Sequence, residues 1–225
     1  MKKILVFGAS GYAKVVIDIL DKSGEWEISG IIDERGASGA VSWFGYPILG
    51  ADADLPIIVE EKEVEHGIIA VGDNFLRNKI YLKILSLCPQ FQLGTAIHPN
   101  ASIAKGAVIA EGTVISAGAV VNSDSRIGRC CIVNTRASLD HDSSMGDFSS
   151  LAPGVAMGGN VHVGAFSAVC IGAVVKHGIV IGEHSVVGAG SIVMGDIPPL
   201  SVSYGQPCRF VRSRKKGEPY LKSNS

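Results

Sequence analysis

The residues best suited to proton transfer lie near the middle of the chain, where His141 stands between Asp140 and Asp142. The side chain of a free histidine has a pKa of about 6.5, and a neighbouring carboxylate can orient its ring. Such a pair is suited to take a proton from an incoming amine or hydroxyl. From the residues alone, an exposed histidine in a polar turn is the alternative interpretation, because polar turns carry the same residue types.

A second candidate site lies near the N-terminus, where residues 8–13 join a predicted strand to a predicted helix. Backbone N–H groups at such a turn favour anions. The turn is a partial dinucleotide fingerprint, because Ser10 stands where the second glycine of GxGxxG belongs. Asp33, 25 residues after Gly8, could accept a ribose hydroxyl. A tight turn without a ligand is the alternative interpretation.

A further strand is predicted to end at Gly72, and Asp73 and Asn74 after it form a helix N-cap sequence. The strand ends at Gly8, Asp33 and Gly72 would face one crevice of a parallel sheet, which favours a nucleotide as ligand. A dehydrogenase is disfavoured, because we find no separate domain for the substrate of a hydride transfer.

A repeat of six residues predicts the element that carries His141. Between residues 97 and 193, every sixth residue is Ile, Leu, Val or Met. The positions are Ile97, Ile103, Ile109, Ile115, Val121, Ile127, Val133, Leu139, Met145, Leu151, Met157, Val163, Val169, Val175, Ile181, Val187 and Val193. This period fits neither an amphipathic helix nor an alternating strand, and it is typical of a parallel β-helix whose coils each have three sides.

Turn formers stand three residues after most of these aliphatic positions, as at Gly106, Asp124 and Asp142. Gly, Asn and Asp tolerate the positive φ that a sharp corner requires, so His141 is predicted to lie at a corner. The repeat makes just under six coils, which would stack to a height of about 25–28 Å. It also accounts for the 28 glycines and for the 6% aromatic content, because stacked aliphatic residues fill the narrow interior.

The same repeat explains a mean hydropathy of +0.31 without a membrane span. Residues 148–175 contain no Asp, Glu, Lys or Arg, but Pro153, Gly158 and Gly159 interrupt them. A spanning helix needs about 20 predominantly apolar residues in succession. The first residues predict a strand and not a signal peptide, so we expect a cytoplasmic protein with no membrane partner.

Metal sites, disulfides and nucleic-acid binding are disfavoured. The five cysteines are an odd number without CxxC spacing, which indicates reduced thiols. His177 would lie two coils from His141 on the same corner, about 10 Å away and too far to share a metal. The other histidines are expected to be structural or solvated. A net charge of −1 does not favour nucleic acid.

The chain is expected to form a small Rossmann-like αβ domain over residues 1–95, a β-helix over 96–200 and a tail over 201–225. Strands are predicted at 3–8, 28–33 and 67–72, with helices at 12–22 and 74–87, and the apolar run 56–59 continues the alternation. The tail is expected to leave the β-helix after Pro199, with residues 222–225 frayed.

The chain resembles the sugar O- and N-acetyltransferases of the hexapeptide-repeat acyltransferases, typified by sialic-acid O-acetyltransferases and by N-acetyltransferases of bacterial 4-amino-sugar pathways. The motifs that carry the resemblance cover nearly the whole chain. They are Gly8 to Val16, Ile32-Asp33, Val71-Gly72-Asp73-Asn74, His141-Asp142, Gly146-Asp147-Phe148, Ala152-Pro153-Gly154, Gly159-Asn160-Val161 and Gly205-Gln206-Pro207. The resemblance implies a left-handed β-helix and a homotrimer with active sites between subunits.

The resemblance also implies roles for individual residues. His141 would be the general base, and Asp142 would orient it and raise its basicity. The positions that would hold the nucleotide sugar are Ser10, Gly11, Tyr12, Asp33, Glu34 and Gly72. Those that would meet acetyl-CoA are Ser150, Ile171 and Ala189. Relatives usually have histidine where Tyr12 stands, and often where Ser150 stands.

The implied reaction is transfer of an acetyl group from acetyl-CoA, with no metal, to the 4-amino group of a nucleotide-linked deoxyamino sugar. Three alternatives remain open: O-acetylation of a sialic acid or related sugar, a non-catalytic trimeric nucleotide-binding module, and γ-class carbonic anhydrase chemistry. His141, His162 and His177 do not show the spacing of the last. The basic cluster from Arg209 to Lys216 is a solvated tail or a contact with CoA phosphates.

Overall fold

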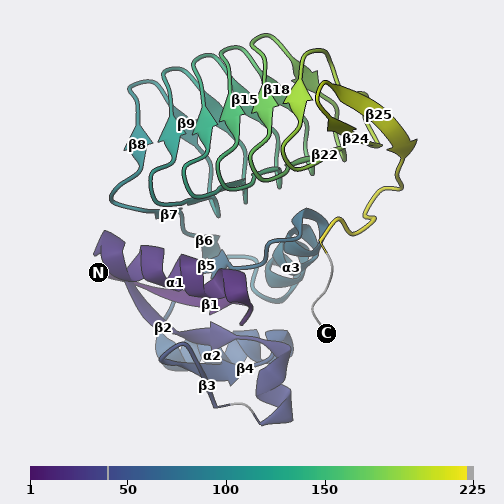
Figure 1. The fold of residues 1–225 in the computed structure, drawn as a ribbon. Helices are drawn as coiled ribbons and strands as arrows, with labels where there is room; N and C mark the ends of the chain where they lie inside the picture. The colour runs from purple at the N-terminus through teal and green to yellow at the C-terminus, as the bar shows by residue number, and fades with distance from the viewer. Residues whose placement is uncertain (40, 222–225) are drawn as a thin grey trace.

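The computed structural model describes residues 1–39 and 41–221. An N-terminal α/β domain lies against a prism of stacked coils, and the C-terminal segment returns from the end of the prism to the α/β domain (Figure 1). Residues 222–225, which the sequence predicts to be frayed, lie outside the described residues. In the part of the chain that the structure describes, no helix is long and apolar enough to cross a membrane.

The N-terminal domain is built on a sheet with the strand order β3-β4-β2-β1-β5-β6. Its strands are β1 (Lys2–Phe7), β2 (Trp26–Ile32), β3 (Ser42–Trp43), β4 (Tyr46–Gly50), β5 (His66–Ile69) and β6 (Gln92–Leu93). Neighbouring strands are parallel except β3 and β4, which form a hairpin. Ile4, Leu5 and Val6 are fully buried, as expected for a parallel strand that is covered on both faces.

Three α-helices and two short 3₁₀ helices of the described chain complete this domain: α1 (Gly11–Ser23), η1 (Glu34–Ser38), η2 (Asp52–Asp54), α2 (Leu55–Lys62) and α3 (Asn74–Leu87). The apolar run 56–59 lies in α2, where Pro56 occupies the first turn and costs no intrahelical hydrogen bond. Asp73 caps α3, because its Oδ1 accepts the N–H groups of Phe75 and Leu76 at 3.0 and 2.9 Å. The N-cap prediction is confirmed.

The coils form a left-handed parallel β-helix with one two-residue strand on each side of each coil. Face 1 consists of β7 (Ala96–Ile97), β10 (Val114–Ile115), β13 (Ile132–Val133), β16 (Ser150–Leu151), β19 (Ala168–Val169) and β22 (Val186–Val187). Face 2 consists of β8 (Ser102–Ile103), β11 (Val120–Val121), β14 (Ser138–Leu139), β17 (Ala156–Met157), β20 (Val174–Val175) and β23 (Ile192–Val193). Face 3 consists of β9 (Val108–Ile109), β12 (Arg126–Ile127), β15 (Ser144–Met145), β18 (His162–Val163) and β21 (Val180–Ile181).

The aliphatic residues of the six-residue repeat, here called rungs, form the core of this prism. Every rung from Ile115 to Val193 is buried, whereas Ile97, Ile103 and Ile109 are partly exposed at the open end. Each coil aligns residues 18 apart in sequence, as in the pairing of Val121 with Leu139. This stacking lets each inward aliphatic side chain pack on the equivalent residue of the next coil.

At the corner between faces 3 and 1, large residues replace the turn formers. Phe148, Phe166 and His184 have φ of 59°, 60° and 54°. Each non-glycine residue in this conformation costs about 1–2 kcal/mol. Their rings stack in a column, with centroid distances of 5.3 and 4.5 Å, and α3 packs against it through Phe75 and Tyr81. The packing of this column against the N-terminal domain offsets the backbone cost.

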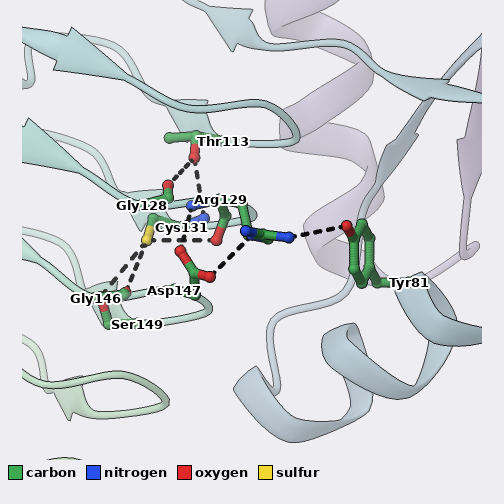
Figure 2. Close-up of polar contacts among 8 residues, drawn as sticks. All are labelled: Tyr81, Thr113, Gly128, Arg129, Cys131, Gly146, Asp147 and Ser149. Atoms are coloured by element: carbon green, nitrogen blue, oxygen red, sulfur yellow. Dashed lines mark hydrogen bonds and ion pairs between the residues drawn. The ribbon is translucent and has the colours of Figure 1, made fainter.

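Figure 2 shows two hydrogen-bond systems at the same corner. Thr113 Oγ1 donates to the carbonyl of Gly128 at 2.9 Å and accepts the Cys131 N–H, which ties consecutive coils together. On the outside, Arg129 pairs with Asp147 at 2.9 Å and donates to the hydroxyl of Tyr81 on α3 at 3.1 Å. The corner is therefore bonded both along the prism and to the N-terminal domain.

After Pro199 the chain does not leave the β-helix directly. β24 (Ser201–Gly205) pairs with β22 and extends face 1, and β25 (Cys208–Ser213) pairs antiparallel with β24. Ser201 and Ser203 of β24 are buried at inward positions. These small residues continue the inward-facing pattern of the coils, although neither is aliphatic, and so the chain stays on face 1. This hairpin closes the end of the prism (Figure 1).

Candidate active site

His141 and Asp142 form a paired site at the corner between faces 2 and 3. Nδ1 of His141 lies 2.8 Å from Oδ2 of Asp142, and the two side chains are 60% and 63% exposed. Asp142 has the left-handed φ of 56° that the corner requires. This turn places its carboxylate beside the imidazole of the preceding residue.

The surrounding carboxylates make the imidazole more basic. The hydrogen bond to Asp142, and then the charge of Asp140, hold the pKa of His141 above its ordinary value. Asp140 is fixed in turn, because its Oδ1 accepts the His141 N–H at 2.9 Å and the Asn122 side-chain amide at 2.6 Å. The bond from the His141 N–H is the largest cause of the lowered pKa of Asp140. With Nδ1–H held by Asp142, Nε2 is free to accept a proton.

Gly159, one coil further along the same corner, provides the space for this ring. A Cβ added to Gly159 would lie 2.5 Å from both Cε1 and Nε2 of His141, closer than real side-chain contacts. Only glycine therefore fits beneath the imidazole in the observed position.

The residues expected to hold a nucleotide sugar gather at the carboxyl ends of β1, β2 and β5. Ser10 precedes α1 and its hydroxyl lies 3.4 Å from the carbonyl of Ala70, which joins the turn to the end of β5. Asp33 accepts the N–H groups of Ala9 at 2.7 Å and of Arg35 at 3.0 Å. Its carboxylate therefore shapes the turn, a role in addition to the expected contact with a ribose.

The remaining members of this group differ in their surroundings. Glu34 is 71% exposed and lies 3.6 Å from the Lys83 ammonium. The hydroxyl of Tyr12 is buried and has no hydrogen-bond partner among the described residues. Burial raises the pKa of Tyr12, so this hydroxyl stays protonated. Gly11 is exposed at the first turn of α1.

The residues expected to meet acetyl-CoA lie on or beside face 1. Ser150 is an outward residue of β16 and is buried beneath the C-terminal segment, where its hydroxyl lies 3.2 Å from that of Tyr220. Ile171 and Ala189 follow β19 and β22 and stand 18 residues apart, on successive coils. Ile171 is 61% exposed and Ala189 is exposed as well, so both residues are accessible.

Comparisons with known proteins agree with this architecture. Residues 3–84 match the family model of the PglD N-terminal domain. A structure of a variant of GDP-perosamine N-acetyl transferase from Caulobacter crescentus, bound to CoA and GDP-perosamine, is 34% identical, with a TM-score of 0.88 over 95% of this chain and 98% of that one. The chain belongs to the hexapeptide-repeat sugar acetyltransferases.

Two further relatives support this membership. The acetyltransferase domain of PglB from Neisseria gonorrhoeae, solved with acetyl coenzyme A, is 31% identical, with a TM-score of 0.84 over 93% of this chain and 99% of that one. WeeI from Acinetobacter baumannii is 26% identical, with a TM-score of 0.80 over 94% of this chain and all of that one. This acetyltransferase therefore shares its whole architecture with them.

Within one chain of this acetyltransferase, the predicted site residues fall into two groups. His141 and Asp142 lie at the corner of faces 2 and 3, which is opposite face 1 in a three-sided prism. The N-terminal domain covers face 1, where Ala96 and Val114 are buried in one cluster with its residues. The structure therefore does not bring the base and the nucleotide-sugar residues together within a single chain.

Sequence reasoning missed three residues that join the domains of the acetyltransferase: Asn74, Arg77 and Tyr220. Asn74 was expected only as part of a helix start, but its amide donates to the carbonyl of Ser167 at 3.0 Å. Arg77 is 1% exposed on α3, and its guanidinium donates to carbonyls of the β-helix and of the loop at Gly72. The helical spacing could have identified Arg77 as buried, because it lies on the same face of α3 as buried Tyr81 and Ile84.

Three of the other histidines have structural contacts. Nδ1 of buried His98 accepts the N–H of Asn100 at 3.0 Å, and His184 stacks on Phe166. His162 pairs with Ser144 at 2.9 Å on face 3. Among the described residues, no group of three or more His, Cys, Asp or Glu side chains is arranged to hold a metal.

Proposed function

We propose that this acetyltransferase transfers the acetyl group of acetyl-CoA to the 4-amino group of a nucleotide-linked deoxyamino sugar. The observation that carries the proposal is the relative with CoA and GDP-perosamine bound, which matches 95% of this chain. The His141–Asp142 pair supports it independently, because a basic imidazole is what an amine nucleophile requires. The exposed residues Ile171 and Ala189 leave room for the arm of an acyl donor beside the coils.

The chemistry follows from the position of the imidazole. Asp142 holds Nδ1–H, and Nε2 takes a proton from the amine as its nitrogen attacks the thioester carbonyl. The tetrahedral oxyanion is stabilised by backbone N–H groups of a neighbouring coil. Collapse breaks the C–S bond, and His141 returns the proton to the departing CoA thiolate. No acyl-enzyme is needed.

The split of the site supports a homotrimer with the active site between subunits. One chain would supply the nucleotide-sugar crevice at face 1, and its neighbour would supply His141 from the opposite corner. Exposed aliphatic side chains on faces 2 and 3 suit burial against another chain; they include Val174, Val180, Ile192 and Met194. Light scattering is expected to give about 70 kDa, three times the chain mass of 23.5 kDa. A monomeric mass for an active enzyme would contradict this arrangement.

The function is tested by incubating the enzyme with acetyl-CoA and a panel of UDP-, GDP- and dTDP-linked 4-amino sugars. The release of CoA measures the transfer. An amide product survives mild base, whereas an ester is cleaved. A base-labile product on a sialic acid would instead support O-acetylation. Absence of transfer to every member would favour a non-catalytic nucleotide-binding module.

Asp142→Asn is expected to move the pH profile of kcat/KM. The base works when it is deprotonated, so activity rises as pH increases through the pKa of His141. The Asp142 carboxylate is the main cause of that raised pKa. Its removal should therefore shift the acidic limb to lower pH and lower the plateau by about tenfold or more, because the imidazole is less basic and less well oriented. An unmoved limb, or one at higher pH, would contradict this role.

A further inference from the structure

The C-terminal segment from Arg214 to Leu221, here called the strap, runs from the end of the β-helix back to the N-terminal domain (Figure 1). Arg214 is 9% exposed; its N–H donates to the carbonyl of Leu200 at 2.8 Å, and its guanidinium donates to that of His184 at 3.1 Å. Glu218 pairs with Arg212 at 2.8 Å. The strap is thus fixed at several points before it reaches the α/β domain.

The strap places the hydroxyl of Tyr220 between the residues expected to hold the nucleotide sugar and those expected to meet acetyl-CoA. This oxygen lies 3.1 Å from the carbonyl of Gly72, 3.2 Å from Oδ1 of Asn74 and 3.2 Å from Oγ of Ser150. A tyrosine hydroxyl donates only one proton, so the Gly72 carbonyl and Oδ1 of Asn74 compete for it, whereas the Ser150 hydroxyl can donate to the tyrosine oxygen. Leu221 then packs on Gly72, from which an added Cβ would lie 3.3 Å away.

The second tyrosine of this region is Tyr12, and its hydroxyl differs from that of Tyr220 because it has no partner among the described residues. Tyr12 and Tyr220 both lie near the Arg77 guanidinium, whose charge opposes the effect of burial on each pKa. The Tyr12 hydroxyl is buried and unpaired within the described residues. An unpaired buried hydroxyl costs about 1–3 kcal/mol, and a ligand with hydroxyl or carbonyl groups would remove that cost.

The chemistry of the cluster indicates which part of a ligand it would take. Burial raises the pKa of both tyrosines, so their hydroxyls are neutral donors. Arg77 directs its N–H groups to carbonyl and amide oxygens of the protein. Neutral hydroxyls that can donate and accept match the hydroxyl groups of a sugar ring better than they match a diphosphate.

We propose that Tyr220 is a substrate-binding residue, and that its hydroxyl, with that of Tyr12, binds the sugar ring of the acceptor. The strap is then a wall of the active site that the C-terminus supplies. This assignment rests on the proposed function, because it takes the acceptor to be a sugar nucleotide. It adds a contact from a tyrosine that no motif of the sequence singles out.

The experiment compares Tyr220→Phe and Tyr12→Phe with Tyr204→Phe, which removes a hydroxyl from a side chain that is 52% exposed on β24. Tyr220→Phe should raise the KM and the calorimetric Kd of the amino-sugar nucleotide about tenfold, with the KM of acetyl-CoA within about twofold of wild type. Tyr12→Phe should also raise the acceptor KM while the Tm stays level or rises, because it removes an unpaired hydroxyl. Tyr204→Phe should leave the KM and the Kd of the amino-sugar nucleotide unchanged.

The remaining outcomes contradict the proposal. A lower Tm for Tyr220→Phe with an unchanged acceptor Kd would make the strap a purely structural connection. Tighter acceptor binding would mean that the strap occludes the crevice, and a raised KM for acetyl-CoA alone would place Tyr220 at the acyl donor. If the wild type binds the nucleotide sugar but does not transfer acetyl, the proposed function is wrong while the Kd values still decide the role of Tyr220. If it binds none of the panel, both are wrong.

Discussion

Replacing His141 with alanine is expected to lower kcat by about 10²- to 10⁴-fold, the usual contribution of a positioned general base. In the proposed mechanism Nε2 of this ring takes the amine proton, while the other nitrogen is held by Asp142 at 2.8 Å. The KM of acetyl-CoA and of the acceptor should change by less than about threefold, because most of the binding surface is elsewhere. Steady-state kinetics at saturating concentrations of both substrates measures the loss.

His177→Ala is the matched control, since His177 is an exposed histidine two coils along the same corner. It should keep the turnover of the wild type. Equal losses in the two variants would indicate a general disturbance of the corner, and near-normal turnover of His141→Ala would rule out the base.

Gly159→Ala should reproduce much of the loss without removing the imidazole. The added methyl group would stand 2.5 Å from Cε1 and Nε2 of His141, so the ring must move out of line with the acceptor. A displacement of about 1 Å at a reacting group can cost about a hundredfold in rate. Gly195→Ala is the control, because a Cβ at this position would have open space around it. Gly154→Ala is unsuitable, because its φ of 70° would strain any residue with a side chain.

The β-helix could be predicted from the sequence because its period is local and long. A rung every six residues determines the inward side of each coil, and the rungs from Ile115 to Val193 are buried as that pattern requires. The turn preference likewise placed Asp142 at a corner with φ of 56°. The pairing of His141 with Asp142 then follows from adjacency in the chain.

The contacts between the domains could not be predicted in the same way. Tyr220 reaches Gly72 across 148 residues of sequence, and no periodic pattern encodes that approach. At the corner of faces 3 and 1, Phe148 and Phe166 interrupt the expected turn formers, and their reason becomes visible only where α3 packs against them. The separation of the site into two groups depends on which face the N-terminal domain covers, which is a tertiary choice.

Arg77 makes the most demanding of these contacts. Its Nε donates to the carbonyl of Cys130 at 2.7 Å and one Nη donates to that of Phe148 at 3.1 Å, on successive coils. The remaining N–H groups bond Val71 and Gly72, at 3.0 and 3.1 Å, and Oδ1 of Asn74 at 2.8 Å. All five N–H groups of the guanidinium are therefore satisfied by neutral oxygens of the described chain, and one side chain bonds the loop at Gly72 to the β-helix.

Arg77→Met is expected to lower the free energy of unfolding by about 3 kcal/mol or more, because three buried or partly buried carbonyl oxygens lose their donor. Methionine fills much of the volume but leaves the carbonyl oxygens of Val71, Cys130 and Phe148 without this donor, and each such group costs about 1–3 kcal/mol before relaxation. Urea unfolding followed by circular dichroism measures the change, with Lys79→Met as an exposed control on the same helix. Because the loop at Gly72 loses its link to the β-helix, the acceptor KM should rise as well. A variant as stable as wild type would mean that desolvating the guanidinium cancels its five hydrogen bonds, and the two domains would then be held together by the packing of α3 on Phe148 and Phe166.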